Sequence, residues 1–147
     1  MALVKPRLVL NPEPRLEALL ESIQRVEAFA QANQMSSQNT YALTVAVEEL
    51  LTNTIMFGFE GVAEPDLVVS LEGRAERVIC EISDNGAGFD PRGTEDDSNQ
   101  TDPRRQSFPS ELIREIAPHL EWRYEEGRNL VRLEYFKGDQ SVEQTGQ

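Results

Sequence analysis

The chain has 147 residues, enough for one domain with its own core, and no second core is expected. It carries 14 Lys and Arg against 26 Asp and Glu, and the net charge of -12 disfavours direct binding to nucleic acid or to anionic membranes. The single cysteine, Cys80, excludes an intrachain disulfide, and no segment resembles a signal peptide or a membrane span. We therefore expect a cytoplasmic protein, whose acidic surface would attract a basic protein partner, while the alternative is that the acidity serves solubility alone.

Strands and helices are predicted in a mixed order along the chain. Runs of β-favouring residues predict strands at residues 7–10, 66–73, 76–83, 120–126 and 129–136. Helices are predicted at residues 15–33, 38–57 and 109–117. Apolar residues recur every third or fourth position in the first helix, Gly58 ends the second, and Pro109 and Pro118 bracket the third. The last two strands form a hairpin around Gly127.

One stretch of the chain lacks apolar side chains. Residues 91–107 contain two prolines and no apolar residue, so they cannot bury enough surface to fold by themselves. We expect a lid loop over residues 91–108 and a disordered tail over residues 138–147. A single domain is thus expected over residues 1–137.

The segment ISDNGAGFDP, residues 82–91, carries an acid and two glycines where a predicted strand ends. Gly86 and Gly88 allow the backbone to bend sharply and to approach a flat or charged ligand, which a Cβ would prevent. The alternative is an Asn-Gly hairpin turn, although Pro91 makes the following residues a poor pairing strand because proline removes a ladder donor. Asp84 is therefore a candidate ligand-contacting residue.

A second polar motif, AVEELLTNTIMFGF, lies in the predicted helix over residues 38–57. Glu49 and Asn53 are four residues apart and share one helical face, so both side chains could meet one ligand. An Asn oxygen suits Mg²⁺ that is completed by waters and phosphates, and a nearby carboxylate can deprotonate an attacking hydroxyl. Glu48 is the competing acid, but it points elsewhere on the helix. The alternative is that Glu49 and Asn53 merely lie on a solvated face.

The two motifs, in this order of helices and strands, resemble the Bergerat-fold ATPases, the histidine-kinase-like (GHKL) group that includes gyrases and histidine kinases. Within that group the chain resembles the small anti-sigma regulatory factors that are serine-protein kinases, of the RsbW and SpoIIAB type. The resemblance runs from RLVLNPEPRLEALL to NLVRLEY, nearly the whole chain. It implies an α+β two-layer sandwich in which a mixed, mostly antiparallel sheet is covered on one face by helices.

The resemblance also implies roles for individual residues. Glu49 stands at the position of the base, Asn53 at that of the Mg²⁺ ligand, and Asp84 at that of the acceptor for the adenine amino group. ATP and its Mg²⁺ would be bound by Asn53, Asp84, Gly86, Gly88 and the lid residues Arg104 and Arg105. A histidine kinase needs a phosphoacceptor histidine on a helix, whereas the only histidine, His119, follows the helix breaker Pro118 and is expected at the surface.

Three residues depart from the family's pattern. Ser107 and Pro109 stand where the family usually carries glycines whose backbone N–H groups hold phosphates, and proline has no N–H to donate. Phe57 replaces a histidine that often follows the magnesium-binding Asn. The set of backbone N–H donors that the resemblance implies for binding the phosphates is therefore incomplete.

The expected function follows from the resemblance. We expect an ATP-binding regulator that sequesters a sigma factor and acts as a serine/threonine-protein kinase on a STAS-type anti-anti-sigma antagonist. The alternative is a non-catalytic, partner-switching binding module that has lost tight ATP binding. A third interpretation is an acidic α+β domain whose motifs match by chance. A homodimer is left open.

Overall fold

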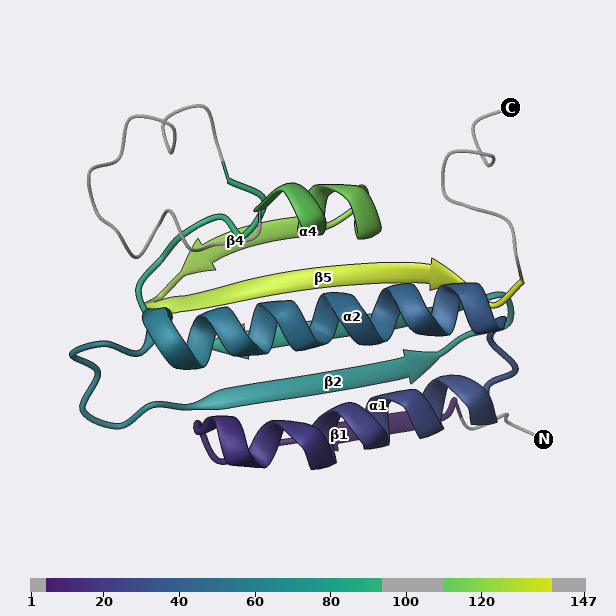
Figure 1. Ribbon diagram of the computed structural model, residues 1–147, viewed down its shortest axis with the longest axis horizontal. Coiled ribbons are helices and arrows are strands. Elements are labelled where there is room, and N and C mark those ends of the chain that lie inside the picture. Colours follow the sequence, from purple (N-terminus) through teal and green to yellow (C-terminus); the bar gives the residue numbers. More distant parts are fainter. Residues whose placement is uncertain (1–4, 94–109, 139–147) are drawn as a thin grey trace.

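The computed structural model describes residues 5–93 and 110–138, which form one sheet with helices packed on one of its faces (Figure 1). The α+β two-layer sandwich predicted from the sequence is confirmed, and so is its helical cover on one face. Most of the predicted lid and almost all of the predicted tail lie outside the described residues.

The sheet has five strands in the order β1-β2-β3-β5-β4. They are β1 (Arg7–Leu10), β2 (Leu67–Gly73), β3 (Arg77–Asp84), β4 (Glu121–Glu125) and β5 (Arg128–Phe136). A mixed, mostly antiparallel sheet was expected, and each neighbouring pair of these strands is antiparallel. The reason is visible between β1 and β2, where the chain crosses the domain twice through two helices and so returns in the opposite direction (Figure 1).

The helical layer agrees with the predicted segments except at the ends of the second helix. Its described helices are α1 (Leu19–Ala32), preceded by the 3-10 turn η1 (Leu16–Ala18), α2 (Ser37–Asn53) and α4 (Ser110–Ile116). α2 begins earlier than predicted because the Ser36 hydroxyl accepts a hydrogen bond from the backbone N–H of Asn39 and caps the helix. After Asn53 the chain continues as a π-helical turn, η2 (Thr54–Gly58).

The core lies between the helices and the inner face of the sheet. Burial alternates along β2 and β5, so that every second side chain of these strands faces α1 and α2. The fully buried side chains include Leu43, Leu51, Leu71, Ile82 and Leu133. Cys80 is also fully buried, and burial raises the pKa of its thiol to about 12, so it stays a protonated, structural side chain.

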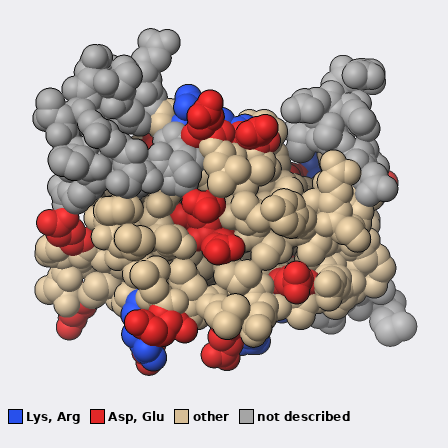
Figure 2. Space-filling model, in the orientation of Figure 1, with Lys and Arg blue, Asp and Glu red and all other residues tan. Residues whose placement is uncertain are grey.

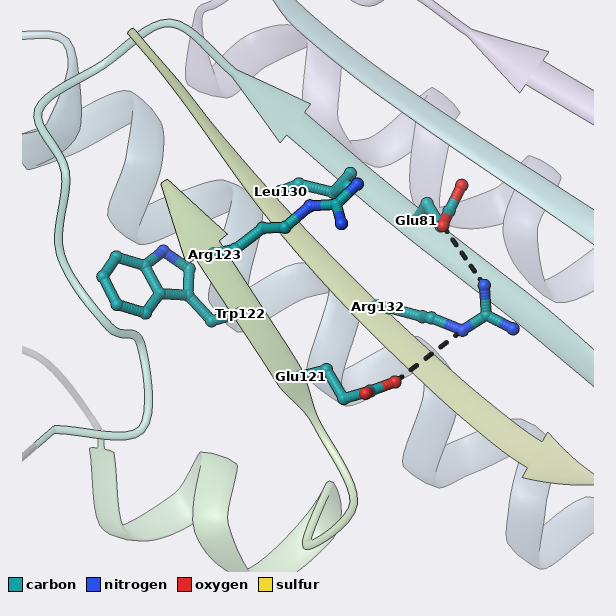
Figure 3. A pocket seen from close by; sticks show the side chains of 6 residues that line it. All are labelled: Glu81, Glu121, Trp122, Arg123, Leu130 and Arg132. Carbon is teal, nitrogen blue, oxygen red and sulfur yellow. Dashed lines mark hydrogen bonds and ion pairs between the residues drawn. The ribbon is translucent and has the colours of Figure 1, made fainter. Parts of the chain in front are cut away.

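No described element covers the outer face of the sheet, where arginines and glutamates of neighbouring strands pair (Figure 3). Arg132 lies 3.4 Å from Glu81 and 3.9 Å from Glu121, beside a hollow of about 230 Å³. These pairs are largely exposed to solvent, and such pairs contribute only about 0 to 1 kcal/mol each. The outer face is therefore a charged, solvated surface.

The prediction that His119 is a surface residue is wrong. The ring is half-buried, its Nε2 accepts a hydrogen bond of 2.8 Å from the backbone N–H of Glu134, and its edge meets the Tyr135 ring at a centroid distance of 5.0 Å. Burial lowers the pKa of His119, although the charges of Glu134 and Glu121 oppose the shift. Pro118 does end the preceding helix, but the chain then turns directly back onto the sheet.

Candidate functional site

The π-helical turn η2 joins the two sequence motifs in space. It follows Asn53 directly, and its last carbonyl, that of Gly58, accepts a hydrogen bond of 2.9 Å from the backbone N–H of Ala87. Single π-helical turns are frequent at functional sites because they redirect the residues that follow a helix. The end of the E-x-x-x-N helix and the D-x-G-x-G turn therefore meet.

Glu49 and Asn53 lie on the protected side of α2. Glu48 is exposed, whereas Glu49 is half-buried and Asn53 is only 8% exposed. Within residues 5–93 and 110–138, no hydrogen bond or ion pair engages the side chain of Glu49 or of Asn53. Asn53 is not among the described residues whose buried side-chain polar atoms lack a partner, so its amide reaches solvent and a ligand could approach it.

Asp84 ends β3 and is 5% exposed. Its Oδ1 accepts hydrogen bonds from the backbone N–H of Gly86, at 2.9 Å, and from Nδ2 of Asn129, at 3.0 Å. Burial raises the pKa of Asp84, and the two hydrogen bonds and the charge of Arg128 oppose that shift. Its Oδ2 has no hydrogen-bond donor among the described residues, so one carboxylate oxygen is held and the other is available.

Asn85 fixes the turn to the loop that precedes β2. Its Oδ1 accepts from the backbone N–H of Asp66 at 2.8 Å, and its Nδ2 donates to the carbonyl of Glu64 at 2.9 Å. β3 pairs with β2 and β5, and residues 85–93 contain no strand, which excludes the Asn-Gly hairpin considered from the sequence. The Asn85 side chain therefore links this turn to Glu64 and Asp66, and it is not part of a two-residue hairpin turn.

The two glycines of the motif are explained by contacts within the protein. A Cβ at Gly86 would lie 2.5 Å from the carbonyl oxygen of Gly58, which is closer than real Cβ atoms come to other atoms. A Cβ at Gly88 would lie 2.8 Å from the ring of Tyr124. Both glycines thus let the turn pack closely, whereas their contact with a ligand stays a prediction.

Sequence reasoning missed Asn129, which lies opposite Asp84 in the pairing of β3 with β5. It is 3% exposed, and besides Asp84 its Nδ2 donates to the carbonyl of Ala87 at 2.9 Å. The available signal was strand alternation, since Asn129 is a polar residue at an inward position of a strand that continues with Val131 and Leu133. Asp84 and Ala87 lie 45 and 42 residues away in sequence, so the signal could not identify them as its partners.

The remaining predicted site residues lie outside the described part of the chain. These are Arg104 and Arg105, together with Ser107 and Pro109 of the altered lid. Among described residues, no group of three or more His, Cys, Asp or Glu could hold a metal. Asn53 could therefore hold Mg²⁺ only together with waters and the oxygens of a bound phosphate. No described helix is long and apolar enough to cross a membrane.

Comparison with known proteins agrees with this architecture. The model of the histidine kinase-like ATPase domain family matches residues 13–135. The fold is similar to the crystal structure of the RsbU and RsbW domains of Rv1364c from Mycobacterium tuberculosis, with a TM-score of 0.59 and 11% sequence identity. That match covers 88% of this chain but 32% of the other, so this chain spans about a third of that protein's length. No curated protein matches the chain significantly.

Proposed function

Because the chain belongs to the histidine kinase-like ATPase family, we propose that it binds Mg²⁺ and ATP between α2 and the turn after β3. The observation that carries this proposal is the pair of available polar groups at the two ends of the site. Among the described residues Oδ2 of Asp84 has no donor, so it can accept from the adenine amino group, and the Asn53 side chain has no partner, so its neutral oxygen can bind Mg²⁺. The hydrogen bond from Ala87 to Gly58 holds these two ends together.

We further propose that the chain transfers the γ-phosphoryl group of ATP to a serine of a protein partner. Glu49 accepts the proton of the serine hydroxyl as its oxygen attacks the γ-phosphorus, and the bond to the leaving ADP oxygen breaks. Mg²⁺ bound with the nucleotide would neutralise the phosphate charge. Arg104 or Arg105 of the lid would add positive charge at the same phosphates.

The proposed partners are those of an anti-sigma regulator. One is a sigma factor that the chain sequesters, and the other is a STAS-type antagonist that receives the phosphoryl group. Figure 2 supports a basic partner, because acidic side chains outnumber basic ones on the helix-covered face. The similarity to a structure that contains an RsbW domain supports the same class of regulator through its fold.

Calorimetric titration of the whole chain with ATP, with and without Mg²⁺, tests the proposal. We expect saturable binding that strengthens when Mg²⁺ is added. The rival function, a binding module without nucleotide chemistry, is favoured by Ser107 and Pro109 in the lid. No heat of binding with millimolar ATP and Mg²⁺ would reject the ATPase proposal and favour that rival.

A further inference from the structure

Asn129 connects Asp84 to the edge strand β4 through a chain of hydrogen bonds. Its Oδ1 accepts from the indole Nε1 of Trp122 at 2.9 Å and from the backbone N–H of Phe89 at 3.3 Å. Its Nδ2 donates to Asp84 at 3.0 Å and to the carbonyl of Ala87 at 2.9 Å. Two donated and two accepted bonds engage both the amide nitrogen and the amide oxygen.

Trp122, together with the backbone N–H of Phe89 and the carbonyl of Ala87, fixes which end of the Asn129 amide faces Asp84. An indole N–H can only donate, so the amide oxygen must face Trp122 and the NH₂ group must face the carboxylate. The reversed amide would place its oxygen against the Asp84 carboxylate and its NH₂ against the indole N–H, and both contacts would be repulsive. Figure 3 shows the Trp122 ring pointing away from Arg123, Leu130 and Arg132, so the outer-face ion pairs do not compete for it.

This arrangement decides what Asp84 offers a ligand. Oδ1 receives two donors, from Gly86 and Asn129, which leaves Oδ2 as an acceptor. The amino group at C6 of adenine is a donor and matches a carboxylate acceptor, whereas the carbonyl at C6 of a 6-oxopurine is itself an acceptor. A protonated Asp84, in contrast, could donate to that carbonyl.

We propose that Trp122 and Asn129 are positioning residues that hold Asp84 as an acceptor and thereby select adenine over 6-oxopurine nucleotides. The inference rests on the proposed ATP binding and adds the residues that set its base specificity. Trp122 orients Asn129, and Asn129 in turn holds Asp84, so Trp122 acts on the ligand only indirectly.

Protonation provides a readout that a purely structural role would not change. Burial raises the pKa of Asp84, while the bonds from Asn129 and Gly86 and the charge of Arg128 oppose the rise. Loss of the Asn129 bond should therefore raise the pKa further and extend the pH range in which Asp84 donates to a 6-oxopurine. Arg128 is itself paired with Asp66 at 2.9 Å, and neither variant described below removes that pair.

The test compares ATP with inosine triphosphate, which carries a carbonyl at C6. Trp122→Phe keeps an aromatic ring and removes the indole donor, and Asn129→Leu removes the whole link. At neutral pH we expect the ratio of ATP to inosine triphosphate affinity, measured by calorimetry with Mg²⁺, to fall about threefold to tenfold in Trp122→Phe, the worth of one hydrogen bond. Asn129→Leu should lower it at least as much, and in both variants the ratio should decline at a higher pH than in the wild type.

Tyr135→Phe is the matched control. Tyr135 also lies on the inner face of the sheet, and its hydroxyl donates to the carbonyl of Ile116 at 2.8 Å, so the variant likewise removes one aromatic donor. Tyr135 pairs with Val78, near the opposite end of β3 from Asp84. The control should lose stability without a change in the affinity ratio.

The outcomes separate the two proposals. If the wild type does not bind ATP, the proposed function fails and the base selection proposed here fails with it. If the wild type binds ATP but Trp122→Phe and Asn129→Leu keep both its affinity ratio and its pH profile, ATP binding stands and the positioning role is wrong. A fall in the ratio that Tyr135→Phe reproduces would also overturn the positioning role.

Discussion

The two ends of the proposed site differ in how the protein holds their polar side chains. At the end formed by β3 and β5, Asp84 and Asn129 are buried and hydrogen-bonded to each other. At the end formed by α2, Glu49 and Asn53 have no hydrogen-bond partner among the described residues. The first end is assembled by folding, whereas the second would be completed only by a ligand.

This difference predicts different consequences for substitutions. A residue bonded within the protein contributes to stability, so its loss should affect both folding and function. A side chain without a partner in the protein contributes little to stability, so its loss should affect function far more than folding. Substitutions at the two ends therefore test whether α2 carries a site at all.

The largest effect is expected for Glu49→Ala. Removal of a general base slows proton transfer by about 10²- to 10⁴-fold, so phosphoryl transfer to a serine-bearing antagonist should nearly stop. The free energy of unfolding and the affinity for ATP should stay close to those of the wild type. Transfer is measured with radiolabelled ATP and a STAS-type protein.

Glu48→Ala is the control for that variant, because Glu48 is the neighbouring exposed acid on α2. It should transfer phosphate at the rate of the wild type. Equal loss of transfer in both variants would contradict the assignment of Glu49 and point to a general effect of negative charge on α2.

Asp84→Asn should weaken ATP binding by about 10- to 100-fold, the worth of a hydrogen bond to a charged group. The amide oxygen can still accept from Gly86 and Asn129, which leaves the NH₂ group to face the adenine amino group, a donor against a donor. The fold should survive. An unchanged dissociation constant in calorimetry would remove Asp84 from the adenine site.

The sequence predicted the first end of the site only in part. β-Branched and aliphatic residues predicted β3, and Asp84 with its two glycines marked the turn that follows it. The hydrogen bond from Asn129 joins residues 45 positions apart, and it depends on the register of β3 with β5 and on the orientation of Trp122. Neither the register nor the orientation is encoded in a local pattern.

The second end was predicted more completely, because Glu49 and Asn53 share a helical face by their spacing alone. The π-helical turn that follows them was not predicted, since TIMFG has no feature that distinguishes a π turn from an α turn. Its contact with Ala87, which brings the two motifs together, also required the tertiary structure. Local periodicity thus predicted most helices and strands, whereas long-range hydrogen bonds determine how the two motifs meet.

One substitution made at both ends compares them directly. Leucine is close to asparagine in shape and lacks polar atoms, so Asn129→Leu should lower the free energy of unfolding by about 1 to 3 kcal/mol by leaving buried donors unpaired. Asn53→Leu should leave it unchanged or raise it, while abolishing the strengthening of ATP binding by Mg²⁺. Urea denaturation at pH 7 measures both variants, and a comparable loss of stability in Asn53→Leu would show that α2 uses Asn53 structurally.

The smallest effect is expected at His119, which lies in the turn between α4 and β4 and is bonded to β5. Burial lowers the pKa of His119 in the folded protein, so the unfolded chain binds a proton more readily as the pH falls. Stability contributed by the neutral ring is present above the ordinary pKa of histidine and is lost as the pH falls through the lowered value in the folded state. Protonation of Nε2 would also remove the acceptor for the Glu134 N–H.

The denaturation midpoint should therefore decrease modestly between pH 7.5 and pH values below the lowered pKa of His119, measured by urea denaturation at constant ionic strength. His119 is the only histidine of the chain, so no other imidazole titrates over this range. His119→Gln is the control, because its side-chain oxygen can still accept from Glu134 but does not titrate. As the pH rises, the wild type should gain stability relative to His119→Gln. The denaturation midpoint of the wild type minus that of the variant should therefore increase with pH. A difference that stays constant would show that His119 remains equally protonated in the folded and unfolded states, contrary to its burial against Tyr135.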